Sequence, residues 1–212
     1  MSKNIYDFLS KATSIVVHPL VLPTYFYLII YYASPQIFAP LVGEVLYWFL
    51  ILSFVCTFLL PALTILILYF THKITVLEIS DRSERILVLI YTIFIYTIWL
   101  YVMYYKFFVN NFLTITYISM LACMTISGII THFWKISLHS TAISGMVVML
   151  GYIVFFLDEK QVLIYFVVSI LAWGAVCSAR LQLHKHTLWQ VLAGTFLGIV
   201  CAIGGMWVAK FV

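Results

Sequence analysis

The sequence predicts an all-α fold, a polytopic transmembrane bundle of six to seven spanning helices, and three observations support this prediction. Hydrophobic residues make up 65% of the 212 residues and charged residues only 8%, whereas about a quarter of the residues of a soluble domain are charged. Apolar runs of about 20 residues, the length that a helix needs to cross a bilayer, recur along the chain. No polar stretch between them is long enough for a soluble domain. We therefore expect residues 1–212 to form a single integral membrane domain.

Seven apolar runs are candidates for spanning helices. The first contains Pro19 and Pro23, and Pro61 is expected to kink the second. Ala193 and four glycines, Gly194, Gly198, Gly204 and Gly205, are expected to let the last helix approach its neighbours closely. The candidate spans are residues 15–33, 45–70, 86–105, 112–131, 141–157, 162–179 and 187–209.

Two features exclude other classes of protein. The four cysteines all fall inside apolar runs, which predicts packing roles rather than a disulfide framework or a metal site. The net charge of +4 is too small and too dispersed to indicate a nucleic-acid partner.

Three polar segments follow the second, fourth and sixth runs: HKITVLEISDRSER (72–85), HFWKISLHS (132–140) and SARLQLHKH (178–186). Because two crossings separate each segment from the next, all three are expected on one side of the membrane, the side of the N-terminus. This side holds eight of the eleven Lys and Arg residues, and such clustering indicates a site rather than random loop polarity. The six histidines lie there or just inside: His18, His72, His132, His139, His184 and His186.

The fixed cations on this side are candidates for anion binding, namely Arg180, Lys135 and either Arg85 or Arg82. Guanidinium groups hold phosphate oxygens in bidentate geometry. Two structural alternatives remain. Basic side chains at a membrane edge often extend to the headgroups, and Asp81 and Arg85 have the spacing of a helical ion pair.

The histidines add reactivity to these cations. Imidazole titrates near neutrality, so His139 and His186 are suited to proton transfer or to attack on phosphorus, and Ser137 offers a further hydrogen bond. The combination predicts phosphoryl transfer on a lipid headgroup. Three other histidines are expected to be interfacial or simply packed: His132, His184 and His18.

The segment SARLQLHKHTLWQ resembles the third signature of the type 2 phosphatidic acid phosphatase superfamily, SRxxxxxHxxxD. Arg180 and His186 have the family spacing, while Gln190 stands at the position of the Asp and Ala179 replaces the Ser. The whole chain is similar to a branch of small bacterial membrane members with HP near the N-terminus, a DRxER segment and an HTxxQ ending. The resemblance spans residues 73–194.

The other two signatures match less completely. KISLHS resembles the second signature, PSGH, through Ser137 and His139. In the first, KxxxxxxRP, Arg85 matches the family arginine, Glu78 occupies the Lys position, and Lys73 and Arg82 lie at other spacings.

The resemblance implies a metal-independent phosphatase with a PAP2-like helical core and no cofactor, and it implies the bacterial inner membrane as its location. The substrate would be a phospholipid or polyprenyl phosphate in the bilayer. His186 would attack phosphorus and form a phosphohistidine, and His139 would protonate the leaving alcohol and then activate water. The implied phosphate-binding residues are Arg180, Ser137, Lys135, Arg85 and Arg82.

Gln190 lies four residues after His186, so its amide oxygen is expected to accept the ring N–H and fix the tautomer. It supplies no negative charge, and Asp to Asn in a serine protease triad lowers turnover by about 10⁴. A catalytically impaired protein that binds anionic headgroups is therefore the main alternative. A b-type haem protein that uses pairs of histidines is a third.

The two arguments on orientation disagree. The positive-inside rule places the histidine side in the cytoplasm, by eight Lys and Arg to three. The count falls to three on each side without Lys73, Arg82, Arg85, Lys135 and Arg180. Members of the resembled family often have the site on the outer face.

Overall fold

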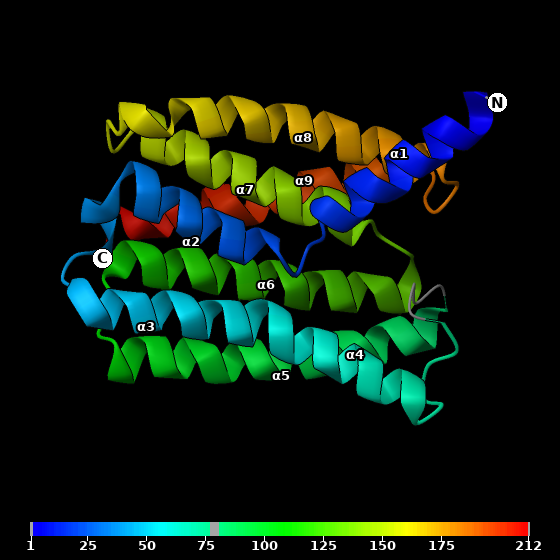
Figure 1. Ribbon diagram of the computed structural model, residues 1–212, viewed down its shortest axis with the longest axis horizontal. Helices are drawn as coiled ribbons and strands as arrows, with labels where there is room; N and C mark the ends of the chain where they lie inside the picture. The colour runs from blue at the N-terminus through cyan, green and yellow to red at the C-terminus, as the bar shows by residue number, and fades with distance from the viewer. Residues whose placement is uncertain (1, 77–80, 212) are drawn as a thin grey trace.

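The computed structural model describes residues 2–76 and 81–211, and every regular element in these ranges is helical (Figure 1). The longer helices are α1 (Ser2–Val16), α2 (Leu22–Ala33), α3 (Gly43–Phe54), α4 (Leu60–Phe70), α5 (Arg82–Lys106), α6 (Asn111–Phe133), α7 (Leu138–Phe155), α8 (Leu163–Gln182) and α9 (Leu188–Ala209). Short helical turns are η1 (Pro35–Phe38), η2 (Val55–Leu59) and η3 (Lys160–Val162).

Six helical stretches in the described ranges are long and apolar enough to cross a membrane. They are Gly43–Phe70, Arg82–Lys106, Asn111–Phe133, Leu138–Phe155, Lys160–Gln182 and Leu188–Ala209. The predicted class, an all-helical bundle of six to seven spans in an integral membrane protein, is confirmed.

The predicted first span, residues 15–33, is wrong in its bounds because α1 and α2 are separate helices. The chain leaves the helix at His18 and Pro19. Pro19 has no N–H to donate, and its ring disfavours helical backbone at the residue before it. α2 has only 12 residues, about 18 Å of helix, against a hydrocarbon core of about 30 Å. Pro23 lies in the first turn of α2, where proline is tolerated.

The disturbance expected at Pro61 is present as the π-helical turn η2, which joins α3 to α4. Pro61 has no N–H for the carbonyl of Thr57, four residues earlier. Tyr96 of α5 donates its hydroxyl to that carbonyl at 3.0 Å. A neighbouring helix thus supplies the hydrogen bond that the proline cannot.

The helices run side by side between two ends of the bundle (Figure 1). One end, called here the histidine end, carries the N-terminus and the connections that follow α4, α6 and α8. The other end carries the connections that follow α2, α5 and α7, together with the C-terminus. Although the first span is broken, α1 and α2 still lead the chain from the histidine end to the opposite end. The described parts of the three polar segments therefore lie at one end, as predicted.

Glycines of α9 allow the close packing that the sequence predicted. A Cβ at Gly194 or Gly198 would overlap backbone oxygens of Ser137 and Thr141, at and near the start of α7. A Cβ at Gly205 would overlap the Ser119 hydroxyl of α6. Gly204 has open space around it, so only part of the expected set serves this purpose.

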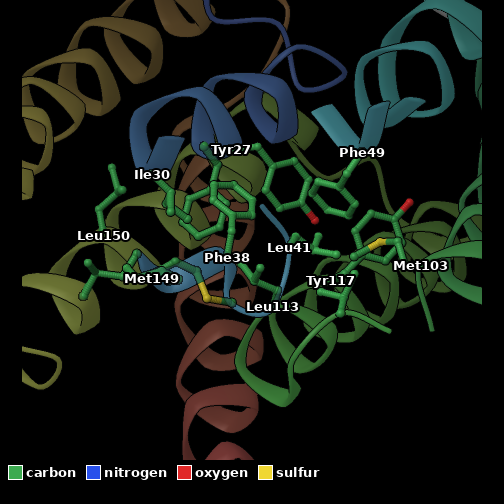
Figure 2. Packing of buried hydrophobic residues seen from close by; sticks show 14 of the residues in the cluster. Tyr27, Ile30, Phe38, Leu41, Phe49, Met103, Leu113, Tyr117, Met149 and Leu150 are labelled. Carbon is green, nitrogen blue, oxygen red and sulfur yellow. The ribbon is translucent and has the colours of Figure 1, made fainter. Parts of the chain in front are cut away.

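The largest cluster of buried apolar side chains joins several helices, and Figure 2 shows part of it from close by. It includes Phe49 in the middle of α3, Met103 near the end of α5, Leu113 near the start of α6 and Leu150 toward the end of α7, so it lies toward the opposite end of the bundle. Phe38 of the α2–α3 connection is fully buried among them. The firmest apolar packing is therefore far from the predicted site.

Candidate functional site

The loop before α7 is joined directly to the start of α9. The Ser137 N–H donates to the Gln190 carbonyl at 3.2 Å, and the Ser140 hydroxyl donates to the Val191 carbonyl at 3.1 Å. Ser137 is also the N-cap of α7, where its hydroxyl accepts from the Ser140 N–H at 3.4 Å, and its side chain is buried. These bonds hold the two predicted signature segments together, although they are far apart in the sequence.

A tight turn after α8 positions His186. The Lys185 N–H donates to the Arg180 carbonyl at 3.2 Å and the His184 N–H to the Leu181 carbonyl at 3.0 Å, which is a Schellman motif. His184 has the left-handed backbone that this motif requires, with φ 52°. The chain then turns into the bundle, and His186 is only 8% exposed.

Gln190 holds both His186 and the first turn of α9. Its N–H donates to Thr187 Oγ1 at 3.4 Å, and its Oε1 accepts from the Thr187 N–H at 3.2 Å, which forms a capping box. The same Oε1 lies 3.1 Å from His186 Nδ1. The predicted hydrogen bond between these two side chains is confirmed.

This geometry fixes the tautomer of His186. The Thr187 N–H can only donate, so the Gln190 atom beside it must be the amide oxygen. That oxygen accepts, and Nδ1 of His186 must therefore carry the ring proton. The other ring nitrogen, Nε2, keeps an unprotonated lone pair.

Three cations surround His186. Burial, followed by the charges of Arg85, Arg180 and Lys135, lowers the pKa of His186 to about 3, although the hydrogen bond with Gln190 raises it. The imidazole is therefore neutral near pH 7. A neutral ring has the lone pair that nucleophilic attack requires.

The cations also act on one another. Burial and the charges of Arg85, Arg180 and Lys185 lower the pKa of Lys135. Arg85 reaches from α5 to the α6–α7 loop and donates from Nη1 to the Ile136 carbonyl at 3.1 Å. This places its guanidinium beside the loop that carries Lys135. An anion bound among these groups would relieve their repulsion.

His139, in the first turn of α7, faces α1. Its Nε2 lies 3.1 Å from the Ser14 carbonyl, which only accepts, so Nε2 is the donor and Nδ1 is the nitrogen available to a ligand. The His18 ring packs against it edge to face, with centroids 5.4 Å apart. Such direct contact leaves no space for a haem between these two rings. His139 also interacts electrostatically with Arg180 and His186 and so belongs to the same cluster.

Arg82 lies apart from this cluster. Its side chain is exposed, and Nη1 donates to the His132 carbonyl at 3.3 Å. Its charge is not among those that shift the pKa of His186. Arg82 is therefore at the rim, and Arg85 is the arginine of this segment that lies beside the cluster. Glu78, at the family Lys position, lies outside the described residues.

The alternative of an ion pair between Asp81 and Arg85 is wrong. Asp81 is the N-cap of α5 and accepts from the Ser83 N–H at 2.8 Å and the Glu84 N–H at 3.3 Å. Its short side chain is used by its own helix, while Arg85 points to the neighbouring loop. The described part of the chain holds one salt bridge, between Lys160 and Asp158 at the opposite end.

Two histidines of the polar segments have backbone roles that the sequence interpretation missed. His72 and His184 both adopt left-handed backbone, with φ 57° and 52°, immediately after α4 and α8. His132 is exposed at the end of α6, as an interfacial residue would be. The capping box was also missed, although Thr-x-x-Gln before an apolar run is its sequence signature.

Helix dipoles add to the positive character of the site. α5, α7 and α9 all begin at the histidine end (Figure 1). The N-terminus of a helix carries partial positive charge and favours an anion within its first turn. His139 lies in the first turn of α7, and His186 lies two residues before α9.

Comparisons with protein-family models, curated proteins and solved structures give no match to this chain. Among the described residues, no three His, Cys, Asp or Glu side chains lie close enough together to hold a metal ion. The functional interpretation therefore depends on the geometry of the site. That site is a buried, neutral imidazole among cations at one end of a membrane bundle.

Proposed function

We propose that the chain is a membrane lipid phosphatase of the type 2 phosphatidic acid phosphatase kind. Its substrate is a phosphomonoester or diphosphate on a lipid headgroup, such as a phospholipid or polyprenyl phosphate. The bilayer delivers this substrate to the histidine end.

The observation that carries the proposal is the state of His186. Gln190 holds the ring proton on Nδ1, so Nε2 keeps its lone pair, and the charges of Arg85, Arg180 and Lys135 act on this ring. Arginine and lysine side chains bind phosphate oxygens and stabilise the charge of the phosphoryl group in transfer. A neutral nucleophile beside fixed cations is the arrangement that phosphoryl transfer to histidine requires.

In the first step, the Nε2 lone pair of His186 attacks phosphorus and forms a P–N bond. The bond between phosphorus and the lipid oxygen breaks, and its electron pair goes to that oxygen. A proton from His139 neutralises the alcohol that leaves. Because His139 Nε2 donates to the Ser14 carbonyl, Nδ1 of the neutral ring carries no proton. Nδ1 must therefore take up a proton, from the phosphomonoester monoanion or from solvent, before it passes that proton to the leaving oxygen.

In the second step, His139 takes a proton from water, and the water oxygen attacks phosphorus. The P–N bond breaks, its electrons return to His186 Nε2, and inorganic phosphate leaves. The Gln190 oxygen orients the ring in both steps, but it gives the imidazolium no opposing charge. Turnover is therefore expected to be slower than in an enzyme with a carboxylate at this position.

The second candidate function is headgroup binding without turnover. It is favoured by the double use of Gln190, whose Oε1 also closes the capping box of α9. The capping box alone is a sufficient structural role for Gln190, so its contact with His186 need not serve catalysis. The same cations would then hold an anionic headgroup that is never cleaved.

Phosphate release separates the two candidates. Purified protein in detergent should release inorganic phosphate from at least one member of a panel of phosphatidate, phosphatidylglycerol phosphate, polyprenyl diphosphate and lipid A. His186→Ala, shown to be folded by its helical circular dichroism, should release none above background. If wild type and His186→Ala are indistinguishable on every lipid, headgroup binding replaces the phosphatase proposal.

A further inference from the structure

A partly open apolar cavity is lined by residues of α2, α5, α6, α7 and α9 and by Pro19 before α2. Its lining is predominantly apolar and includes several methionines, whose flexible side chains adapt to different occupants. The cavity is bounded by Leu89 and Leu138 at the histidine end and by Met149 and Ala202 deeper in the bundle.

One end of the cavity lies next to two histidines of the histidine end. Pro19 and Leu138, which line it, are the chain neighbours of His18 and His139. Leu89, also in the lining, is one helical turn further into the bundle than Arg85. The lining of the cavity therefore begins next to the histidines of the site and extends deeper into the bundle.

The cavity is long enough for a hydrocarbon chain. Leu138 and Met149, both in the lining, are 11 residues apart on α7, since 149 − 138 = 11. At 1.5 Å per residue, this is about 16 Å along the helix axis. An empty apolar cavity destabilises a fold in proportion to its volume, so an apolar occupant stabilises this one.

We propose that this cavity binds one hydrocarbon chain of the lipid whose phosphate occupies the cation cluster. The inference rests on the proposed phosphate site and adds to it a chain-binding subsite in the interior of the bundle. The occupant is an acyl or prenyl chain. The lipid thus inserts one chain between the helices instead of leaving all its chains at the outer surface of the bundle.

A chain-length experiment tests this subsite. Ala202 is buried at the deep end and Ala175 is exposed on α8, so Ala202→Leu and Ala175→Leu make the same change inside and outside the cavity. Ala202→Leu should lower kcat/KM about tenfold for dioleoyl phosphatidate relative to dioctanoyl phosphatidate, because only the longer chain reaches the deep end. Ala175→Leu should leave that ratio unchanged. Met149→Ala, which removes side-chain volume from the lining, should not lower kcat/KM for dioleoyl phosphatidate relative to dioctanoyl phosphatidate. A variant that is only destabilised should instead lose kcat/KM for both lipids to the same extent.

A cross-linking experiment gives a readout that needs no turnover. Phosphatidate with a diazirine at the end of one acyl chain is irradiated with the His186→Ala variant, and adducts are mapped by mass spectrometry. Adducts on Met149, Ala202 or their neighbours in the lining support the subsite. Adducts confined to exposed residues such as Ile203 and Trp207 overturn it.

The two experiments also separate this inference from the proposed function. If adducts form inside the cavity but the wild type releases no phosphate, the chain-binding subsite is supported and the phosphatase proposal is contradicted. If the wild type releases phosphate but adducts form only at the outer surface, the phosphatase proposal is supported and the subsite is contradicted.

Discussion

The two ends of the bundle use their polar residues differently. At the opposite end, Glu159 Oε2 accepts hydrogen bonds from Ser34 Oγ at 2.9 Å and from Gln36 Nε2 at 2.6 Å. The Asn110 amide donates to the Ile37 carbonyl at 2.6 Å and fixes the α2–α3 connection. These hydrogen bonds tie the α2–α3 connection to the start of α6 and to the α7–α8 connection, next to the largest apolar cluster.

At the histidine end, two of the predicted site residues donate to backbone carbonyls. Arg85 donates to Ile136 and His139 to Ser14. A carbonyl satisfies a donor but does not cancel a charge, so Arg85 keeps its positive charge in this contact. Under the proposed function, the opposite end stabilises the fold and the histidine end binds an anion.

The largest expected effect comes from removing the nucleophile or its central cation. His186→Ala and Arg180→Ala should each lower phosphatidate turnover by about 10³-fold or more, because the first removes the attacking atom and the second the charge that stabilises the phosphoryl group. Arg82→Ala, at the exposed rim, is the matched control and should change turnover by a few-fold at most. Equal losses of turnover in Arg180→Ala and Arg82→Ala would contradict a specific role for Arg180 in phosphate binding.

A smaller effect is expected at Gln190. Gln190→Ala removes the acceptor of the His186 proton and should lower turnover by about 10- to 100-fold, as loss of a ring-orienting partner does. It also opens the capping box, so thermal unfolding must be measured beside turnover.

Gln190→Glu is the sharper variant because it keeps the length of the side chain and both acceptor contacts. The added charge stabilises the imidazolium and raises the pKa of His186 from about 3. Turnover should rise, and the acid limb of the pH profile of kcat/KM should move to higher pH. An unchanged acid limb would show that Gln190 does not act through His186.

The smallest expected effect on turnover is at the opposite end. Glu159→Ala leaves the buried Ser34 hydroxyl without its acceptor and should cost about 1–3 kcal/mol of stability. Glu159→Gln keeps an acceptor oxygen and should cost less. Neither variant should change kcat/KM for a lipid phosphate. A loss of kcat/KM of more than about threefold in a folded Glu159 variant would contradict the assignment of separate roles to the two ends.

Counting helix crossings predicted which end would collect the histidines, because crossing parity is insensitive to errors in helix bounds. The spacing of His186 and Gln190 likewise predicted their contact, since four residues make one turn of helix. The break at His18 and Pro19 was missed because apolar composition continues through it. The contact of His139 with Ser14 was also missed, because it depends on how α1 packs against the bundle, which no local pattern encodes.

Oxygen exchange tests the central claim, that His186 of the histidine end takes up a phosphoryl group, without knowledge of the natural lipid. Inorganic phosphate labelled with ¹⁸O is incubated with the protein in unlabelled water, and its isotopic composition is followed by mass spectrometry. If His186 forms a phosphohistidine reversibly, each cycle expels one oxygen as water, so the wild type should deplete the label and His186→Ala should not. Loss of label at the same rate in both proteins, or in neither, would contradict the account.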